Sequence, residues 1–236
     1  MKKLIFLLPV ILFSCHEFIT TTIHGNGSFT TQSRQMSVPD RIKVAGDIDV
    51  VLRQGNESSV TVEADANLVP YIITKIEDGQ LVIRVKEHYS LESSKQILVS
   101  ITTNDLKELS VAGSGNVSSE GMITHNGNMD ISVSGSGDMT LQLNAPSVSA
   151  DILGSGNMKV SGETKDMKLE ISGSGNFTGE TLKAENAKVQ INGSGEARVF
   201  ADMKLNVEIN GSGDVFYKGN ASVDQSVRGS GSVSKI

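Results

Sequence analysis

The sequence predicts an all-β protein that folds as a parallel β-helix with coils of about 18–22 residues. Two observations lead to this prediction. A Gly-Ser-Gly triplet recurs along the second half of the chain, and apolar residues alternate with polar ones around the triplets. The triplets begin at residues 113, 135, 154, 173, 193, 211 and 229, so their spacings are 22, 19, 19, 20, 18 and 18 residues. One such repeat is too short to bury its own apolar face, whereas stacked repeats share a continuous core.

The N-terminus has the order of a secretory signal peptide, because a basic start is followed by an apolar stretch over residues 4–13. This stretch is shorter than the ~20 apolar residues that a membrane-spanning helix needs. The ending Leu12-Phe13-Ser14-Cys15 resembles the lipobox of bacterial lipoproteins, which implies that Cys15, the only cysteine, is lipidated. We therefore expect a signal peptide at 1–14, a lipidated tether at 15–22 and attachment to a bacterial envelope membrane. The outer membrane is favoured, and both of its sides remain open.

Residues 23–112 predict wider, irregular coils that are continuous with the repeats, so that residues 23–236 form one domain. We expect an opening glycine corner at Ile23–Gly27 and a second one at Val44–Asp47. Alternating apolar residues predict strands, and Leu68–Ile72 predicts one short helical turn. Asp78-Gly79 predicts a tight hairpin turn.

Residues 113–236 predict regular coils, each with one strand entering and one strand leaving a glycine corner. Polar residues between the apolar positions, such as Ser172, should face water. An antiparallel sandwich is the rival architecture, but it need not keep the same residue type at the same offset through seven repeats. The inward position two residues before each triplet is β-branched throughout: Val111, Val133, Ile152, Ile171, Ile191, Ile209 and Val227.

The C-terminal segment 224–236 predicts a polar cap on the open end of the stack. Gln225 replaces an apolar residue of the inward pattern, and Arg228 replaces a neutral residue of the outward pattern. Terminal repeats of solenoids are commonly atypical and polar.

Several segments resemble the putative auto-transporter adhesin head GIN domain family, and the resemblance extends from about residue 23 to the end. It implies a right-handed parallel β-helix in secreted or envelope proteins, many of them from Bacteroidetes, and it carries over no catalytic residues. The segments are Ile42–Val50, Val60–Asp65, Asn67–Ile72, Asp78–Ile83 and Val111–Asn116.

An oxygen-bearing side chain follows most triplets, and stacking should align these residues into a ladder: Asn116, Asp138, Asn157, Asn176, Glu196 and Asp214. Calcium-binding glycine/aspartate repeats use such oxygens, but they recur about every nine residues, so the ladder favours hydrogen bonds to turn backbone. Glycosidases need two carboxylates about 5 to 9 Å apart, and only Glu196 and Asp214 fall in adjacent coils. The histidines, His16, His24, His88 and His125, show no metal-ligand spacing. We predict no catalytic, cofactor or metal residues, and Cys15 is the only site residue.

The composition limits the class of partner. The net charge of −6 provides no basic surface for nucleic acid, and aromatic residues at 4% without tryptophan disfavour stacked aromatic platforms for sugars. We therefore predict a noncatalytic, envelope-anchored, adhesin-like or structural module that binds the membrane through its lipid. Its protein or glycan ligand and its oligomeric state stay open. The alternative is a polysaccharide-binding or polysaccharide-degrading protein, which a cleft lined by acids, bases and aromatics would favour.

Overall fold

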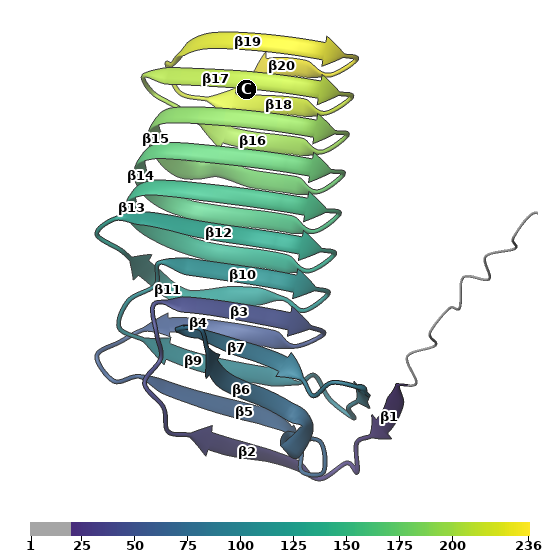
Figure 1. Cartoon of the computed structure of the whole chain (residues 1–236). Helices are drawn as coiled ribbons and strands as arrows, with labels where there is room; N and C mark the ends of the chain where they lie inside the picture. The colour runs from purple at the N-terminus through teal and green to yellow at the C-terminus, as the bar shows by residue number, and fades with distance from the viewer. Residues whose placement is uncertain (1–19) are drawn as a thin grey trace, which may run out of the picture.

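The structure, a computed structural model, describes residues 20–236, and its strands stack into a parallel β-solenoid of about 7 turns (Figure 1). This confirms the predicted fold class. The signal segment and Cys15 lie outside the described residues. Within the described residues, no helix is long and apolar enough to cross a membrane.

The solenoid has two broad faces, which we call the front sheet and the back sheet (Figure 1). The front sheet contains β6 (Ile72–Glu77), β7 (Gln80–Val85), β3 (Arg41–Gly46), β10 (Glu108–Gly113), β12 (Asn128–Gly135), β17 (Lys204–Gly211) and β19 (Ser222–Gly229). The back sheet contains β2 (Phe29–Arg34), β5 (Ser59–Asp65), β9 (Leu98–Thr103), β4 (Asp49–Gln54), β11 (Val117–Thr124), β16 (Glu196–Phe200), β18 (Asp214–Lys218) and β20 (Ser232–Lys235). Three long strands pass through both faces and join them: β13 (Asp138–Gly154), β14 (Asn157–Gly173) and β15 (Asn176–Gly193).

The alternation in the sequence places the apolar side chains between the two sheets. In β14, Leu169 and Ile171 are buried, whereas Lys168 is exposed and Ser172 is only partly covered. Each inward residue stacks on its equivalent in the next coil, as Ile152, Ile171 and Ile191 do in the front sheet. The predicted inward and outward positions are therefore confirmed.

The Gly-Ser-Gly corners form one edge of the stack, and their glycines are required by both conformation and space. Gly135 has a φ of 123°, and a Cβ built there would lie 2.5 Å from the carbonyl oxygen of Gly113 in the coil below. That carbonyl accepts hydrogen bonds from the backbone N–H groups of Ser136 (2.9 Å) and Gly137 (3.0 Å). A side chain on Gly135 would separate the coils that these hydrogen bonds hold together.

The N-terminal end differs from the wider coils that we expected. Here β7 and β9 continue the parallel stack below β3 and β4, but β6 pairs antiparallel with β7, and β5 pairs antiparallel with both β9 and β2. The predicted hairpin at Asp78-Gly79 joins β6 to β7, and the predicted helical turn is a 3-10 helix, η1 (Val69–Tyr71). The alternating pattern did not distinguish these strands, because it is the same in parallel and antiparallel pairs.

The predicted opening corner at Ile23–Gly27 is wrong. β1 (Thr21–His24) pairs with β8 (Tyr89–Glu92) in a separate two-stranded parallel sheet. Gly25 instead packs against Asp65, where a Cβ would lie 2.1 Å from a carboxylate oxygen. The segment Gly25-Asn26-Gly27 resembles a corner in sequence, but Gly25 instead allows the close contact with this buried carboxylate. By contrast, the predicted corner at Val44–Asp47 is confirmed, since Gly46 pairs with Gly113.

The last coil consists of β19 and β20, and it lies at the opposite end of the stack from β2 (Figure 1). Gln225 and Arg228 are exposed there, and Val227 is 38% exposed because no further coil covers it. Arg228 donates a hydrogen bond to Glu208 of the coil below (2.9 Å). The position of this coil fits the proposed cap, whereas its capping role stays a prediction.

Candidate functional site

The predicted Asn/Asp ladder exists, and it runs along the Gly-Ser-Gly edge from Asp49 to Ser232. In most coils the ladder side chain forms a hydrogen bond to the next coil, and the step from Glu196 to Asp214 is the exception. Oδ1 of Asp138 accepts hydrogen bonds from the backbone N–H (3.1 Å) and the side-chain amide (2.8 Å) of Asn157. Oδ1 of Asp214 likewise accepts from the N–H (2.9 Å) and the hydroxyl (2.6 Å) of Ser232. These bonds support the structural interpretation of the ladder, because its oxygens already hold backbone donors.

Within residues 20–236, the structure brings together one pair of the other residues considered for chemistry, Glu196 and Asp214. Glu196 and Asp214 are neighbours in adjacent coils, but Oε1 of Glu196 accepts a hydrogen bond from Arg198 (2.7 Å). His24 contacts Glu92 (2.9 Å) and His125 contacts Asp105 (2.7 Å), while His16 lies outside the described residues. Among residues 20–236, no three His, Cys, Asp or Glu side chains form a group that could hold a metal ion.

The sequence did not reveal an open groove of about 710 Å³ on the edge opposite the triplets. It follows what we call the second corner, where each coil turns from the back sheet to the front sheet. The middle residue of each turn is small and points inward, as shown by Ala145, Thr164 and Ala184 at 3%, 7% and 2% exposure. These residues form the floor of the groove, and the exposed residues on either side form two walls.

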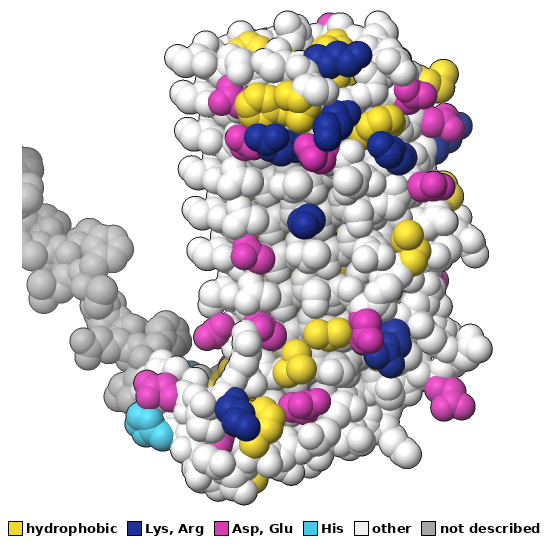
Figure 2. All heavy atoms as spheres, turned by 180° about the vertical axis from the view of Figure 1, so that it is seen from behind, with side chains coloured by type: hydrophobic (Ala, Val, Ile, Leu, Met, Phe, Trp, Pro, Cys, Tyr) yellow, Lys and Arg dark blue, Asp and Glu magenta, His cyan; other side chains and the backbone are white. Residues whose placement is uncertain are grey.

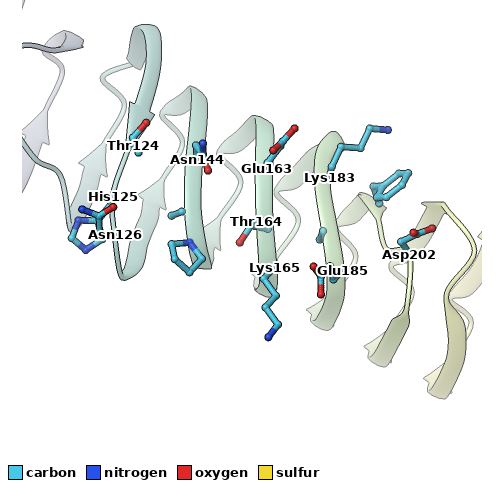
Figure 3. A pocket seen from close by; sticks show the side chains of 14 residues that line it. Thr124, His125, Asn126, Asn144, Glu163, Thr164, Lys165, Lys183, Glu185 and Asp202 are labelled. Carbon is cyan, nitrogen blue, oxygen red and sulfur yellow. The ribbon is translucent and has the colours of Figure 1, made fainter.

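The walls of the groove carry alternating charges. Glu163 and Lys183 lie on one side of the corner, and Lys165 and Glu185 lie on the other (Figure 3). No ion pair joins these four side chains to any residue in the described part of the chain. Their hydrogen-bonding capacity is therefore directed to solvent or to a ligand.

Different residues line the two ends of the groove. At the N-terminal end lies His125, whose side chain is 14% exposed and whose Nδ1 contacts Asp105. At the C-terminal end lie Asp202 and Phe200, and the Lys183 ammonium sits 3.9 Å from the centroid of the Phe200 ring. A cation over an aromatic face is attracted by the ring's quadrupole, so Lys183 and Phe200 hold each other in place.

A second surface feature lies beside the groove, on the back sheet near the C-terminal coils. Figure 2 shows hydrophobic and basic side chains gathered in this region. Arg198 of β16 stacks on the Phe216 ring of β18 with 4.9 Å to the centroid, and Lys218 pairs with Glu180 (3.3 Å). Each of these two cations has a partner within the protein. This surface therefore leaves fewer charged groups free to bind a ligand than the groove does.

Three solved structures are similar to this chain. A putative adhesin from Bacteroides fragilis NCTC 9343 has the same fold, with a TM-score of 0.86 and 22% identity over 91% of this chain and 100% of that one. A putative lipid binding protein from Parabacteroides distasonis ATCC 8503 has a TM-score of 0.74 and 27% identity, and the match covers 92% of this chain and 100% of that one. A putative adhesin from the same strain has a TM-score of 0.74 and 27% identity over 91% and 100% of the two chains.

No curated protein matches the sequence. A family model does match residues 39–221, which include every strand from β3 to β18. The chain therefore belongs to the family described as "putative auto-transporter adhesin, head GIN domain".

Proposed function

We propose that the protein is a noncatalytic, envelope-anchored module that displays a rigid adhesin-like surface to a macromolecular partner. The observation that carries this proposal is the coil-to-coil bonding of the outer polar rows, as in the pairs formed by Asp138 with Asn157 and by Asp214 with Ser232. Carboxylates fixed in such bonds stiffen a surface and are poorly placed to transfer protons. Membership of an adhesin family agrees with this role.

The anchor would be the lipid on Cys15, only five residues before the first described residue, Thr20. β1 lies near the base of the stack, and the last coil lies at the far end (Figure 1). Ten strands follow one another in the front sheet from β6 to β19, giving nine intervals. At a spacing of ~4.8 Å, the solenoid extends the last coil roughly 40 Å from the base.

One of the two Parabacteroides distasonis proteins is named a lipid binding protein, which raises lipid binding as a further role. In this chain, the space between the two sheets is filled by side chains such as Phe177, Leu169 and Leu205, all of them buried. A lipid chain would have to displace this packed core. We therefore assign lipid only to the anchor.

The proposal is tested on cells that produce the protein and on matched cells that lack it. Protease added to intact producing cells should release a fragment of the solenoid, and these cells should adhere better to immobilised glycans or matrix proteins. Incubation of the purified protein with soluble polysaccharides should create no new reducing ends. Full protection from protease, equal adhesion of the two cell types, or steady polysaccharide cleavage would each contradict the proposal.

A further inference from the structure

We infer that the second-corner groove binds a linear, uncharged polysaccharide. This inference deepens the proposed function, because it names the ligand class and the residues that would contact it. The groove crosses five coils, from Thr124 to Asp202, and is open along its length. Four intervals of ~4.8 Å give it a length of roughly 19 Å, which suits an extended polymer better than a compact small molecule.

The backbone at the second corner argues against an extended peptide as the ligand. A peptide that adds to a sheet needs free backbone N–H and C=O groups. Here β13, β14 and β15 run through the corner without a break, and Thr164 pairs with Ala145 below and Ala184 above. Where β15 meets the next coil, the N–H groups of Asp202 and Met203 donate to the carbonyls of Ala184 (3.1 Å) and Glu185 (2.8 Å). The groove therefore offers side chains to a ligand, and its backbone is already used.

The side chains of the walls call for a ligand that both donates and accepts hydrogen bonds. The carboxylates of Glu163 and Glu185 only accept, and the ammonium groups of Lys165 and Lys183 only donate. A sugar hydroxyl can do both, so a chain of hydroxyl groups can satisfy both walls at every coil. The side chains of Ala145, Thr164 and Ala184 point into the core, so the floor carries no projecting side chain and leaves room for sugar rings between the two walls.

The charge of the groove selects against an anionic polymer. Glu163, Glu185 and Asp202 give three negative charges, and Lys165 and Lys183 give two positive charges, so these residues sum to −1. A polyuronate would bring a further negative charge near these carboxylates with too few cations to offset it. An uncharged polysaccharide meets no such repulsion.

The test uses the full-length protein in detergent and titration calorimetry. The probes are neutral hexasaccharides of glucan, mannan and galactan type, with a galacturonate hexasaccharide as the anionic comparison. At least one neutral hexasaccharide should bind, and the galacturonate should bind at least tenfold more weakly. The double variant Lys165→Ala/Glu185→Ala should weaken neutral binding about tenfold or more, because hydrogen bonds to charged groups are lost. Both residues are exposed, so the variant should fold normally.

The matched control is Lys159→Ala/Glu57→Ala, which removes the same two charges from exposed positions outside the groove. It should leave binding within twofold of the wild type. The inference fails if galacturonate binds best, if no neutral probe binds at ~10 mM, or if the groove variant binds like the control. Cells that still adhere while any of these results holds would leave the proposed function intact and remove only the groove as its site.

Discussion

At the scale of single residues, the direction in which a side chain points decides its effect on stability. Ile171 is fully buried between the sheets, and its neighbour Ser172 lies on the outer surface of the front sheet. Because the two residues are neighbours in the chain, the same substitution at each of them tests the effect of burial alone.

Ile171→Asp should lower the free energy of unfolding by about 3–5 kcal/mol, because it leaves an unpaired charge in the core. Ser172→Asp should change it by about 0.5 kcal/mol or less, because the carboxylate stays in water. Denaturant melts of the two variants give the comparison. Equal losses would show that the two faces have been assigned wrongly.

A second residue-scale prediction concerns Asp65, which is buried yet accepts hydrogen bonds from the N–H of Ser94 (2.7 Å) and the hydroxyls of Ser93 (2.8 Å) and Ser94 (2.8 Å). The Ser94 N–H, together with the two hydroxyls, lowers the pKa of Asp65 below its ordinary value, although burial acts in the opposite direction. A lowered pKa in the folded state means that the ionised carboxylate stabilises the fold above the unfolded-state pKa. This stability is lost as the pH falls through the lower, folded-state pKa.

Asp65→Asn should therefore destabilise the protein at pH 7, and the difference from the wild type should shrink as the pH is lowered below about 4. Thermal melts of both proteins from pH 7 to pH 3 measure this. Asp202→Asn, at an exposed position, serves as the control and should show little difference at any pH. A gap between Asp65→Asn and the wild type that stays constant with pH would contradict the assigned role of the carboxylate.

At the scale of elements, the stacking of one glycine corner on the next is the main requirement. Gly154 and Gly46 both have positive φ, at 118° and 94°. A Cβ on Gly154 would lie 2.6 Å from the carbonyl oxygen of Gly135, whereas a Cβ on Gly46 would meet nothing within 4 Å. Comparing an alanine substitution at each of these two glycines therefore separates the effect of backbone strain from the effect of a collision between coils.

Gly46→Ala should cost about 1–2 kcal/mol of stability from the left-handed conformation alone. Gly154→Ala should cost clearly more, because the added methyl group also pushes two coils apart. Chemical denaturation of both variants measures the difference. If both variants lose the same stability, close stacking is not what selects glycine at these corners.

The terminal coil is the other element with a testable role. Deleting residues 220–236 would uncover the coil that contains Ile209, Val207 and Leu205, all of which are buried. It would also remove Arg228, whose charge lies at the open edge. Exposed edges of this kind invite pairing with other chains, so the shortened protein should associate as its concentration rises. Sedimentation velocity over a hundredfold concentration range checks this, and a shortened protein as monodisperse as the full chain would refute the cap assignment.

At the scale of the whole molecule, the sequence predicted the parts that repeat and missed the parts that depend on three-dimensional context. The column with Ile171 and the ladder with Asp138 were visible because the same chemistry recurs at a fixed offset. The antiparallel pairing of β2, β5 and β6 was not visible, because alternation carries no strand direction. The groove was missed because its floor residues, such as Ala145 and Thr164, share small size and a place in the coil but not an identity.

Cys15 is the proposed site of the lipid anchor, and Cys15→Ser tests this proposal directly. The variant should lose fatty-acid labelling and move from the detergent-rich to the aqueous phase. The solenoid itself should keep the same melting temperature, since the described coils begin after this residue. Labelling that persists in the variant would place the anchor elsewhere.

The way the chain enters the stack has a consequence for how the protein can change its length. β3 and β4 are formed early in the chain but lie between two later coils, since β7 and β9 pair below them and β10 and β11 pair above. The base is thus interlaced, whereas from β12 upward each coil rests only on its predecessor. Excision of residues 154–172, one complete 19-residue period, would join Leu153 to Gly173. β15 would then stack on the equivalent positions of β13 in place of those of β14. Height can therefore vary in steps of one coil by duplication or loss of a gene segment, which makes this solenoid a spacer of adjustable reach on a fixed foundation.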